Sequence, residues 1–115
     1  MPGCRLTTHV LDTARGVPAA GVRVELHRIA PGPAALEGAM TDADGRAVLL
    51  PEDAFRPGRY ELRFHIGAYF AATGLAEDPP FLDIVPVRVL LPEGRAQTHV
   101  PLLCAPFGYT TYRGS

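Results

Sequence analysis

Hydrophobic and polar residues alternate along short stretches of the chain, with the period of two that is typical of half-buried β-strands. In residues 22–27 (VRVELH), every second residue is Val or Leu, and charged residues or His stand between them. Residues 60–66 (YELRFHI) repeat this pattern with aromatic and aliphatic residues. We expect each stretch to place one face in the core and the other in water. His27 and His65 are therefore predicted to be solvated surface residues.

Similar patterns elsewhere predict an all-β sandwich. Gly and Pro interrupt the apolar stretches at intervals of roughly ten to fifteen residues, and the residues Arg15–Pro18 are expected to form a turn. The stretch Gly67–Gly74 is the one that favours a helix, because good or neutral helix formers end there at a glycine. The remaining predicted strands are Leu6–Asp12, Leu36–Thr41, Arg46–Leu50, Ile84–Leu91, Thr98–Cys104 and a short strand after Pro106-Phe107-Gly108.

Two of these segments carry further expectations. The strand Ile84–Leu91 has Val, Ile and Leu on both faces, which predicts burial by the partner sheet on one side and by a neighbouring subunit on the other. Pro86 lacks a backbone N–H and favours an edge or a bulge.

The sequence TDADG at 41–45 predicts a tight turn that joins its two flanking strands in a hairpin. A calcium loop is the alternative, but the later oxygen ligands and the bidentate Glu are missing.

Length and charge limit the class of protein. The 115 residues suit a single domain, 1–115, small enough for assembly to add usefully to burial. Eleven basic and twelve acidic residues are spread along the chain without a basic run, which argues against a nucleic-acid partner. No apolar stretch approaches the about 20 residues that cross a bilayer, and the N-terminal residues lack a secretory signal pattern. We expect a cytoplasmic protein with no membrane partner.

The two cysteines are Cys4 and Cys104, near opposite ends of the chain. They could form a disulfide only if the two ends met. In a reducing compartment the favoured interpretation is two free thiols, and no neighbouring motif activates either one.

Candidate chemistry lies in two terminal strands that contain the same tripeptide, Thr-His-Val, with histidines at His9 and His99. Imidazole exchanges a proton near neutral pH, and the guanidinium groups of Arg46 and Arg113 are permanent donors for carbonyl or oxyanion oxygens. With Ser115 at the tail, these groups suit the hydrolysis of a planar, oxygen-rich substrate. Zinc held by the two histidines and a cysteine stays open as an alternative. Nucleophile-elbow, phosphate-loop and dinucleotide motifs are absent from the sequence.

A resemblance to a known family is carried by the segments LTTHVLDTARGVPAAGVRVEL, TDADGRA, RYELRFHIGAYF and FLDIVPVRV, and most specifically by THVPLLCAPFGYTTYRGS. The chain resembles the 5-hydroxyisourate hydrolases, the transthyretin-like enzymes of urate breakdown, over essentially its whole length. The middle of the chain alone resembles many noncatalytic prealbumin-like modules. Transthyretin, the hormone carrier of this fold, lacks the Tyr-Arg-Gly-Ser ending.

The resemblance implies a transthyretin-like β-sandwich of two four-stranded sheets with one short helix, assembled as a homotetramer with active sites between dimers. It implies that water opens the six-membered ring of 5-hydroxyisourate without a metal or organic cofactor. His9 is the expected base, and His99 orients water or returns the proton. A noncatalytic carrier or interaction module on the same fold is the alternative. The implied catalytic residues are His9, Arg46, His99 and Ser115, and His9, Arg46, Tyr112, Arg113 and Gly114 are implied to bind substrate.

The tail carries one more expectation. Gly114 is predicted to tolerate no side chain, either because its φ is positive or because substrate approaches its backbone.

Overall fold

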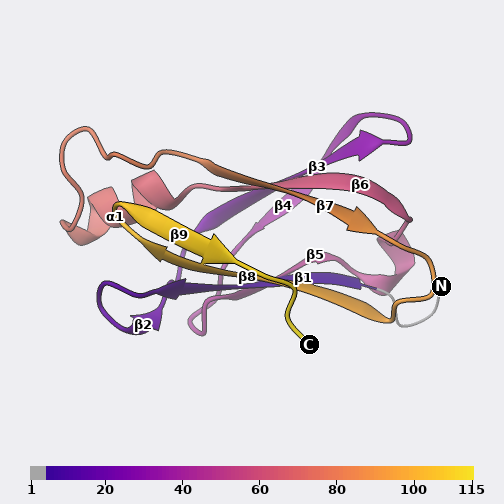
Figure 1. Ribbon diagram of the computed structural model, residues 1–115, viewed down its shortest axis with the longest axis horizontal. Coiled ribbons are helices and arrows are strands. Elements are labelled where there is room, and N and C mark those ends of the chain that lie inside the picture. Colours follow the sequence, from indigo (N-terminus) through magenta and orange to yellow (C-terminus); the bar gives the residue numbers. More distant parts are fainter. Residues whose placement is uncertain (1–4) are drawn as a thin grey trace.

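The computed structural model describes residues 5–115, which form a sandwich of two β-sheets with one helix at its end (Figure 1). Alternating hydrophobic residues form the strands, and Gly- and Pro-containing turns end them, as the sequence predicts. The elements are β1 (Arg5–Asp12), β2 (Val17–Pro18), β3 (Arg23–Ala30), β4 (Ala34–Met40), β5 (Arg46–Leu50), a 3₁₀ helix (Glu52–Ala54), β6 (Gly58–Phe64), α1 (Ile66–Thr73), β7 (Val85–Leu91), β8 (Gln97–Ala105) and β9 (Gly108–Thr111).

The two sheets differ in how their strands pair. One sheet has the order β4-β3-β6-β7 and is antiparallel throughout. In the other, β1 pairs in parallel with β8, and β9 follows β8. The free edge of β1 is shared by β5, which pairs with Leu6–His9, and by β2, which pairs with Leu11 and Asp12. This sheet therefore has five strands rather than the predicted four, because Val17 and Pro18 extend the expected turn into a short strand.

The turn at residues 41–45 forms as predicted, but the hairpin does not. Asp42 Oδ1 accepts hydrogen bonds from the backbone N–H groups of Asp44 and Arg46, each 2.9 Å long, and Gly45 has a φ of 77°. The strands on either side, β4 and β5, belong to different sheets. The hydroxyl of Thr41 donates to the carbonyl of Ala19 at 2.6 Å, which holds the crossing segment against the chain before β3. The same turn residues can join two strands of one sheet or two strands of different sheets. The sequence pattern therefore did not reveal that the chain crosses from one sheet to the other here.

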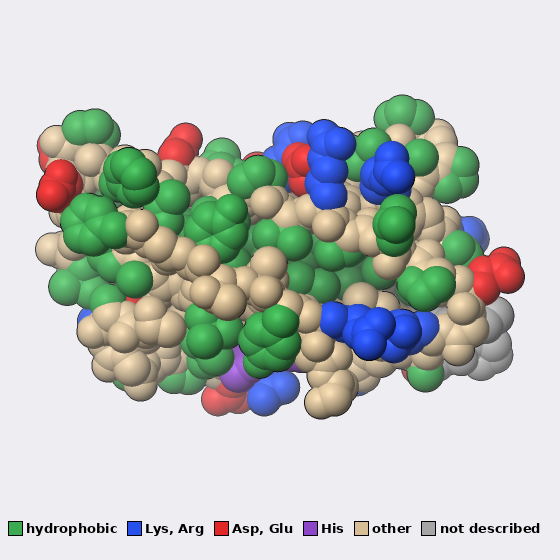
Figure 2. Space-filling view, in the orientation of Figure 1, with side chains coloured by type: hydrophobic (Ala, Val, Ile, Leu, Met, Phe, Trp, Pro, Cys, Tyr) green, Lys and Arg blue, Asp and Glu red, His purple; other side chains and the backbone are tan. Residues whose placement is uncertain are grey.

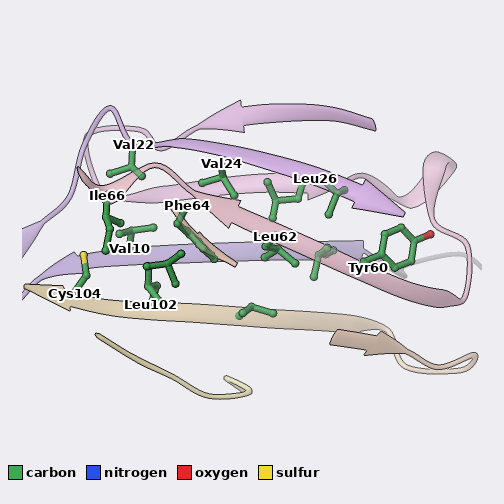
Figure 3. Close-up of a cluster of buried hydrophobic side chains, with 14 of the residues drawn as sticks. Val10, Val22, Val24, Leu26, Tyr60, Leu62, Phe64, Ile66, Leu102 and Cys104 are labelled. Carbon is green, nitrogen blue, oxygen red and sulfur yellow. The ribbon is translucent and has the colours of Figure 1, made fainter. Parts of the chain in front are cut away.

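A single hydrophobic core fills the space between the sheets (Figure 3). The inward faces of β3 and β6 supply residues such as Val24, Leu26 and Leu62, all fully buried, and Val10 and Leu102 face them from β1 and β8. Cys104 lies in this core as a free thiol, and burial raises its pKa to about 12. Cys4 lies outside the described residues. The thiol of Cys104 is therefore protonated and inert at neutral pH.

His27 and His65, which were predicted to be solvated, each form a hydrogen bond with Glu25 instead. Glu25 lies between them: its carboxylate bonds His65 Nε2 through one oxygen and His27 Nε2 through the other, the latter at 3.1 Å. These hydrogen bonds lower the pKa of Glu25 to about 2. The expectation that His27 and His65 are simply solvated is wrong, because β3 and β6 are neighbours and bring Glu25 and His27 of β3 beside His65, which directly follows β6.

Two predictions about the far end of β6 and about β7 can also be compared with the structure. The strand β6 ends at Phe64, so Ile66, predicted in the strand, is the first residue of α1. The helix ends at Gly74 with a left-handed φ of 78°, as its glycine predicts. The strand β7 is the edge of its sheet, which agrees with Pro86. Within residues 5–115, no helix combines the length and the apolar character that crossing a membrane requires.

A buried carboxylate joins α1 to the β1 sheet. The side chain of Asp12 is fully buried, and it accepts hydrogen bonds from Arg15 Nε at 2.9 Å and from the Tyr69 hydroxyl at 2.8 Å. Arg15 in turn donates to the Tyr69 oxygen at 2.7 Å. Burial opposes ionisation of Asp12, but hydrogen bonds from Arg15 and Tyr69 outweigh it and lower its pKa. The helix is thus tied to the strand that carries His9.

We expect Tyr69→Phe to lower the free energy of unfolding by about 1–2 kcal/mol, because the buried carboxylate of Asp12 loses one of its donors while the ring still packs against Phe70. Urea unfolding of the wild-type protein and of Tyr69→Phe, at the same protein concentration, measures this difference. An unchanged unfolding midpoint would mean that the hydroxyl contributes nothing to the attachment of α1.

Candidate active site

The parallel pairing of β1 with β8 brings the two Thr-His-Val histidines together. Thr7 is the register partner of His99, and His9 is the partner of Pro101, so the histidines stand on adjacent strands and are offset by two residues. Their ring centroids are 6.4 Å apart and the rings are inclined by 36°. The two histidines thus lie close together on one sheet.

Arg46 joins them from the other edge of β1. It is the register partner of His9 in the antiparallel β1–β5 pair, and opposite residues in such a pair point to the same face. A pocket of about 210 Å³ opens here. It is lined by Arg5, Thr7, Thr8, Asp42, Arg46, Ala47, Val48, Gln97 and His99. Two guanidinium groups and an imidazole thus face one space, which suits a substrate rich in oxygen.

The contact of His9 defines the protonation of its ring. His9 Nε2 lies 2.9 Å from the backbone carbonyl oxygen of Asp44, in the turn before β5. A carbonyl oxygen only accepts hydrogen bonds, so Nε2 must carry the hydrogen. In the neutral ring, Nδ1 therefore keeps the lone pair. His9 has the form required of a base that accepts a proton through Nδ1.

His99 is held differently. Its Nδ1 lies 2.8 Å from the hydroxyl oxygen of Thr7, on the neighbouring strand. Partial burial lowers the pKa of His99, and the nearby charges of His9 and Arg46 lower it further. The ring is consequently neutral at physiological pH.

Gly114 packs directly against His99. Its backbone N–H donates to the carbonyl oxygen of His99 at 2.8 Å, which extends the β8 pairing into the tail. A Cβ at Gly114 would lie 2.6 Å from Cδ2 of the His99 ring and 3.3 Å from Pro101 Cγ. The φ of Gly114 is not positive, so that part of the expectation is wrong. The residue must be small because the His99 imidazole occupies the space that a side chain would need.

The structure does not place the rest of the tail in this pocket. Tyr112 and Arg113 line a separate cavity of about 310 Å³, which is also lined by Val87 and Leu90 of β7 and by Thr98 of β8. The side chain of Tyr112 is 55% exposed, and Ser115 is exposed as well. Of the residues predicted for the site, one chain therefore assembles His9, Arg46, His99 and Gly114, and leaves Tyr112, Arg113 and Ser115 apart from them.

Of the nine residues that line the pocket, only Arg46 and His99 were predicted for the site; the polar residues that were missed include Arg5, Thr7 and Gln97. A signal for them existed in the sequence. Side chains two residues apart on a strand share a face, so Thr7 and Arg5 lie on the face of His9, and Gln97 lies on the face of His99.

Within residues 5–115, no group of three His, Cys, Asp or Glu side chains lies close enough to hold a metal ion. Cys104, one of the two cysteines considered for zinc, points into the core.

The chain is similar to known proteins over nearly its whole length. A 5-hydroxyisourate hydrolase of Deinococcus radiodurans is 49% identical over 113 residues, which cover 96% of this chain and 95% of that protein. The solved structure of a Klebsiella pneumoniae 5-hydroxyisourate hydrolase matches with a TM-score of 0.81 and 34% identity, over 96% of this chain and 99% of that one. A sea bream transthyretin, solved in complex with thyroxine, matches with a TM-score of 0.85 and 30% identity, over 96% and 95% of the two chains.

The same fold thus occurs in an enzyme and in a thyroxine-binding protein, and the sequence profile of one family covers both. Residues 6–114 match that profile, which spans all nine strands except the first residue of β1. The chain belongs to the HIUase/Transthyretin family.

Proposed function

We propose that this protein is a 5-hydroxyisourate hydrolase of urate catabolism, which opens the six-membered ring of its substrate to give 2-oxo-4-hydroxy-4-carboxy-5-ureidoimidazoline. The observation that carries the proposal is that Arg46 and His99 line one small pocket and that His9 stands beside them, as the register partner of Arg46 and with its ring centroid 6.4 Å from that of His99. A noncatalytic carrier would need a pocket without such titratable groups. The near 50% identity to an enzyme of this name supports the same activity.

In the proposed reaction, His9 is the general base. Its Nδ1 accepts a proton from water as the water oxygen attacks a ring carbonyl of 5-hydroxyisourate. The ring bond between that carbon and the neighbouring nitrogen then breaks, and the leaving nitrogen takes up a proton. A positioned base of this kind contributes about 10²–10⁴-fold to the rate. No metal or organic cofactor takes part.

Positive charge stabilises the transition state. Arg46 and Arg5 line the pocket, and their guanidinium groups can hold substrate oxygens and offset the negative charge that builds on the attacked carbonyl oxygen. Asp42, also on the pocket wall, is held by the backbone N–H groups of Asp44 and Arg46, which lower its pKa and keep it ionised. The ionised Asp42 lies near Arg46, and its hydrogen bonds hold the turn that precedes Arg46.

We further propose a homotetramer in which a second subunit completes each active site. Exposed apolar side chains support this assembly: Leu90 of β7 is 68% exposed, and Phe107, beside β9, is 59% exposed. Hydrophobic side chains cover much of the face on which β7 and β9 lie (Figure 2). Patches of this kind mark interfaces. In the assembly, Tyr112, Arg113 and Ser115 contact substrate or close the site. A cytoplasmic location belongs to the same proposal.

Replacing either histidine should nearly abolish turnover. We expect His9→Ala and His99→Ala each to lower kcat/KM by about 10²–10⁴-fold, and the double variant to be little worse, since groups within one catalytic unit are not additive. The measurement is the ultraviolet decay of freshly generated 5-hydroxyisourate. His27→Ala, which changes a histidine outside the pocket, is the control and should keep full activity. Losses that multiply in the double variant would contradict a shared catalytic role.

Gly114→Ala should impair catalysis more than folding. The new methyl group would displace the His99 ring, and we expect kcat to fall about tenfold or more while the melting temperature changes little. Gly108→Ala is a matched control, because a Cβ there meets no atom within 4 Å and its φ is not positive.

A chain that ends at Tyr112 should lose most activity as well. Full activity in either altered tail would exclude the tail from the site.

Light scattering tests the assembly. The wild-type protein should have the mass of a tetramer, and Leu90→Lys should shift it toward smaller, less active species, because a charge cannot be buried unpaired in an apolar interface. Met40→Lys is the matched control, since Met40 is 63% exposed on β4, at the opposite edge of the same sheet. A monomer mass for fully active protein would refute the shared site.

A further inference from the structure

The hydroxyl of Thr7 lies between two polar side chains of β8. Its oxygen is 2.8 Å from His99 Nδ1 and 3.1 Å from Nε2 of the Gln97 amide. Thr7 is only 7% exposed, so water competes little for these contacts. The three residues lie on one face, because Thr7 is the register partner of His99 and Gln97 is two residues before it.

Counting hydrogens defines the direction of this chain of contacts. An amide NH₂ group can only donate, so the Thr7 oxygen accepts from Gln97. A hydroxyl has a single hydrogen to donate, and within residues 5–115 His99 Nδ1 is the acceptor that lies within hydrogen-bond distance of the buried Thr7 hydroxyl. His99 Nδ1 must then be the acceptor. The hydrogen of the neutral ring consequently resides on Nε2.

We propose that Thr7, oriented by Gln97, is a positioning residue that keeps His99 in the neutral Nε2–H form, so that His99 acts as a hydrogen-bond donor while His9 acts as the base. The two histidines are thus given opposite roles by their partners. The Asp44 carbonyl leaves His9 with a lone pair on Nδ1, and the Thr7 hydroxyl leaves His99 with a hydrogen on Nε2.

The catalytic role of His99 rests on the proposed hydrolysis. The tautomers assigned to the two histidines decide which of them can transfer a proton in that reaction. A neutral imidazole that gave up its Nε2 hydrogen would become an imidazolate, which is too basic to form at neutral pH. His99 therefore polarises the carbonyl or holds the developing oxyanion without losing its proton. His9 takes the proton from water and, as the imidazolium, returns it to the leaving ring nitrogen. One histidine shuttles the proton, and the other donates a hydrogen bond.

The ring of His99 is held at both of its edges. Thr7 contacts Nδ1 on one side of Cγ, and the backbone of Gly114 packs against Cδ2 on the other. These two contacts restrict rotation of the ring about its bond to Cβ. Such preorganisation matters because a displacement of about 1 Å in a catalytic group can cost about 10²-fold in rate.

Long-range ¹H–¹⁵N correlation spectra of the imidazole rings test the assignment directly. They are recorded on the ¹⁵N-labelled full chain at neutral pH without substrate, and His99→Gln identifies the His99 signals. We expect wild-type His99 to show a protonated Nε2 and an unprotonated Nδ1. We expect Thr7→Val to show a mixture of both tautomers. Gln97→Glu should favour Nδ1–H, because a carboxylate accepts the Thr7 hydrogen and turns the Thr7 lone pair toward His99.

Kinetics of the same variants connect the tautomer to turnover. Thr7→Val should lower kcat about tenfold with little change in KM, since the lost interaction acts in the transition state. Thr7→Ser keeps the hydroxyl and should restore most of kcat. Thr13→Val is the matched control, because its hydroxyl donates at 3.1 Å to the Cys104 carbonyl at the other end of the β1–β8 pair.

A wild-type His99 with its hydrogen on Nδ1 would overturn the proposal, as would a Thr7→Val protein with unchanged tautomer and kcat. Persistence of Nε2–H in Gln97→Glu would remove Gln97 from the assignment. The spectra need no substrate. A wild-type protein that shows the Nε2–H form but does not hydrolyse 5-hydroxyisourate would therefore refute the proposed function and leave the positioning of His99 in place.

Discussion

The parallel pairing of β1 with β8 is the interaction on which the site depends. It joins residues 92 positions apart, such as Thr7 and His99, and runs from Arg5 and Gln97 to Asp12 and Cys104. The buried hydroxyl of Thr8 strengthens the register by donating to the Val100 carbonyl at 2.6 Å. Because side chains alternate between faces, a slip of one residue would turn one of the histidines into the core. Burial of Val10 and Leu102 against the other sheet makes that slip costly.

The two histidines are chemically identical, and their neighbours make them different. A backbone carbonyl contacts His9, and a hydroxyl contacts His99. Partial burial and nearby positive charge lower the pKa of His99. Hydrogen-bond partners and local electrostatics can thus divide acid–base roles between like residues, as carboxylate pairs do in other enzymes. In this chain, the partner of His9 is Asp44, in the turn before β5, and the partner of His99 is Thr7 of β1. The proposed roles therefore depend on how the strands of the sheet pair.

Core and chemistry occupy opposite faces of the same strands. On β1, the face with Leu6 and Val10 is fully buried between the sheets, while the face with His9 is open to the pocket side. The outer residues are therefore free to change without loss of the core. This separation gives a physical account of a family in which one fold includes an enzyme and a thyroxine-binding protein.

The sequence by itself determined most strands, the helix with its terminal glycine and the identity of the catalytic candidates, because period-two burial, turn chemistry and Thr-His-Val motifs are local patterns. Only the tertiary structure decided that β4 and β5 lie in different sheets and that Glu25 pairs with His27 and His65. It also decided that His99 occupies the space beside Gly114 and that Thr7 contacts its ring. These features depend on which distant strands become neighbours and in which register. Burial of the whole core selects that pairing, and no local pattern contains it.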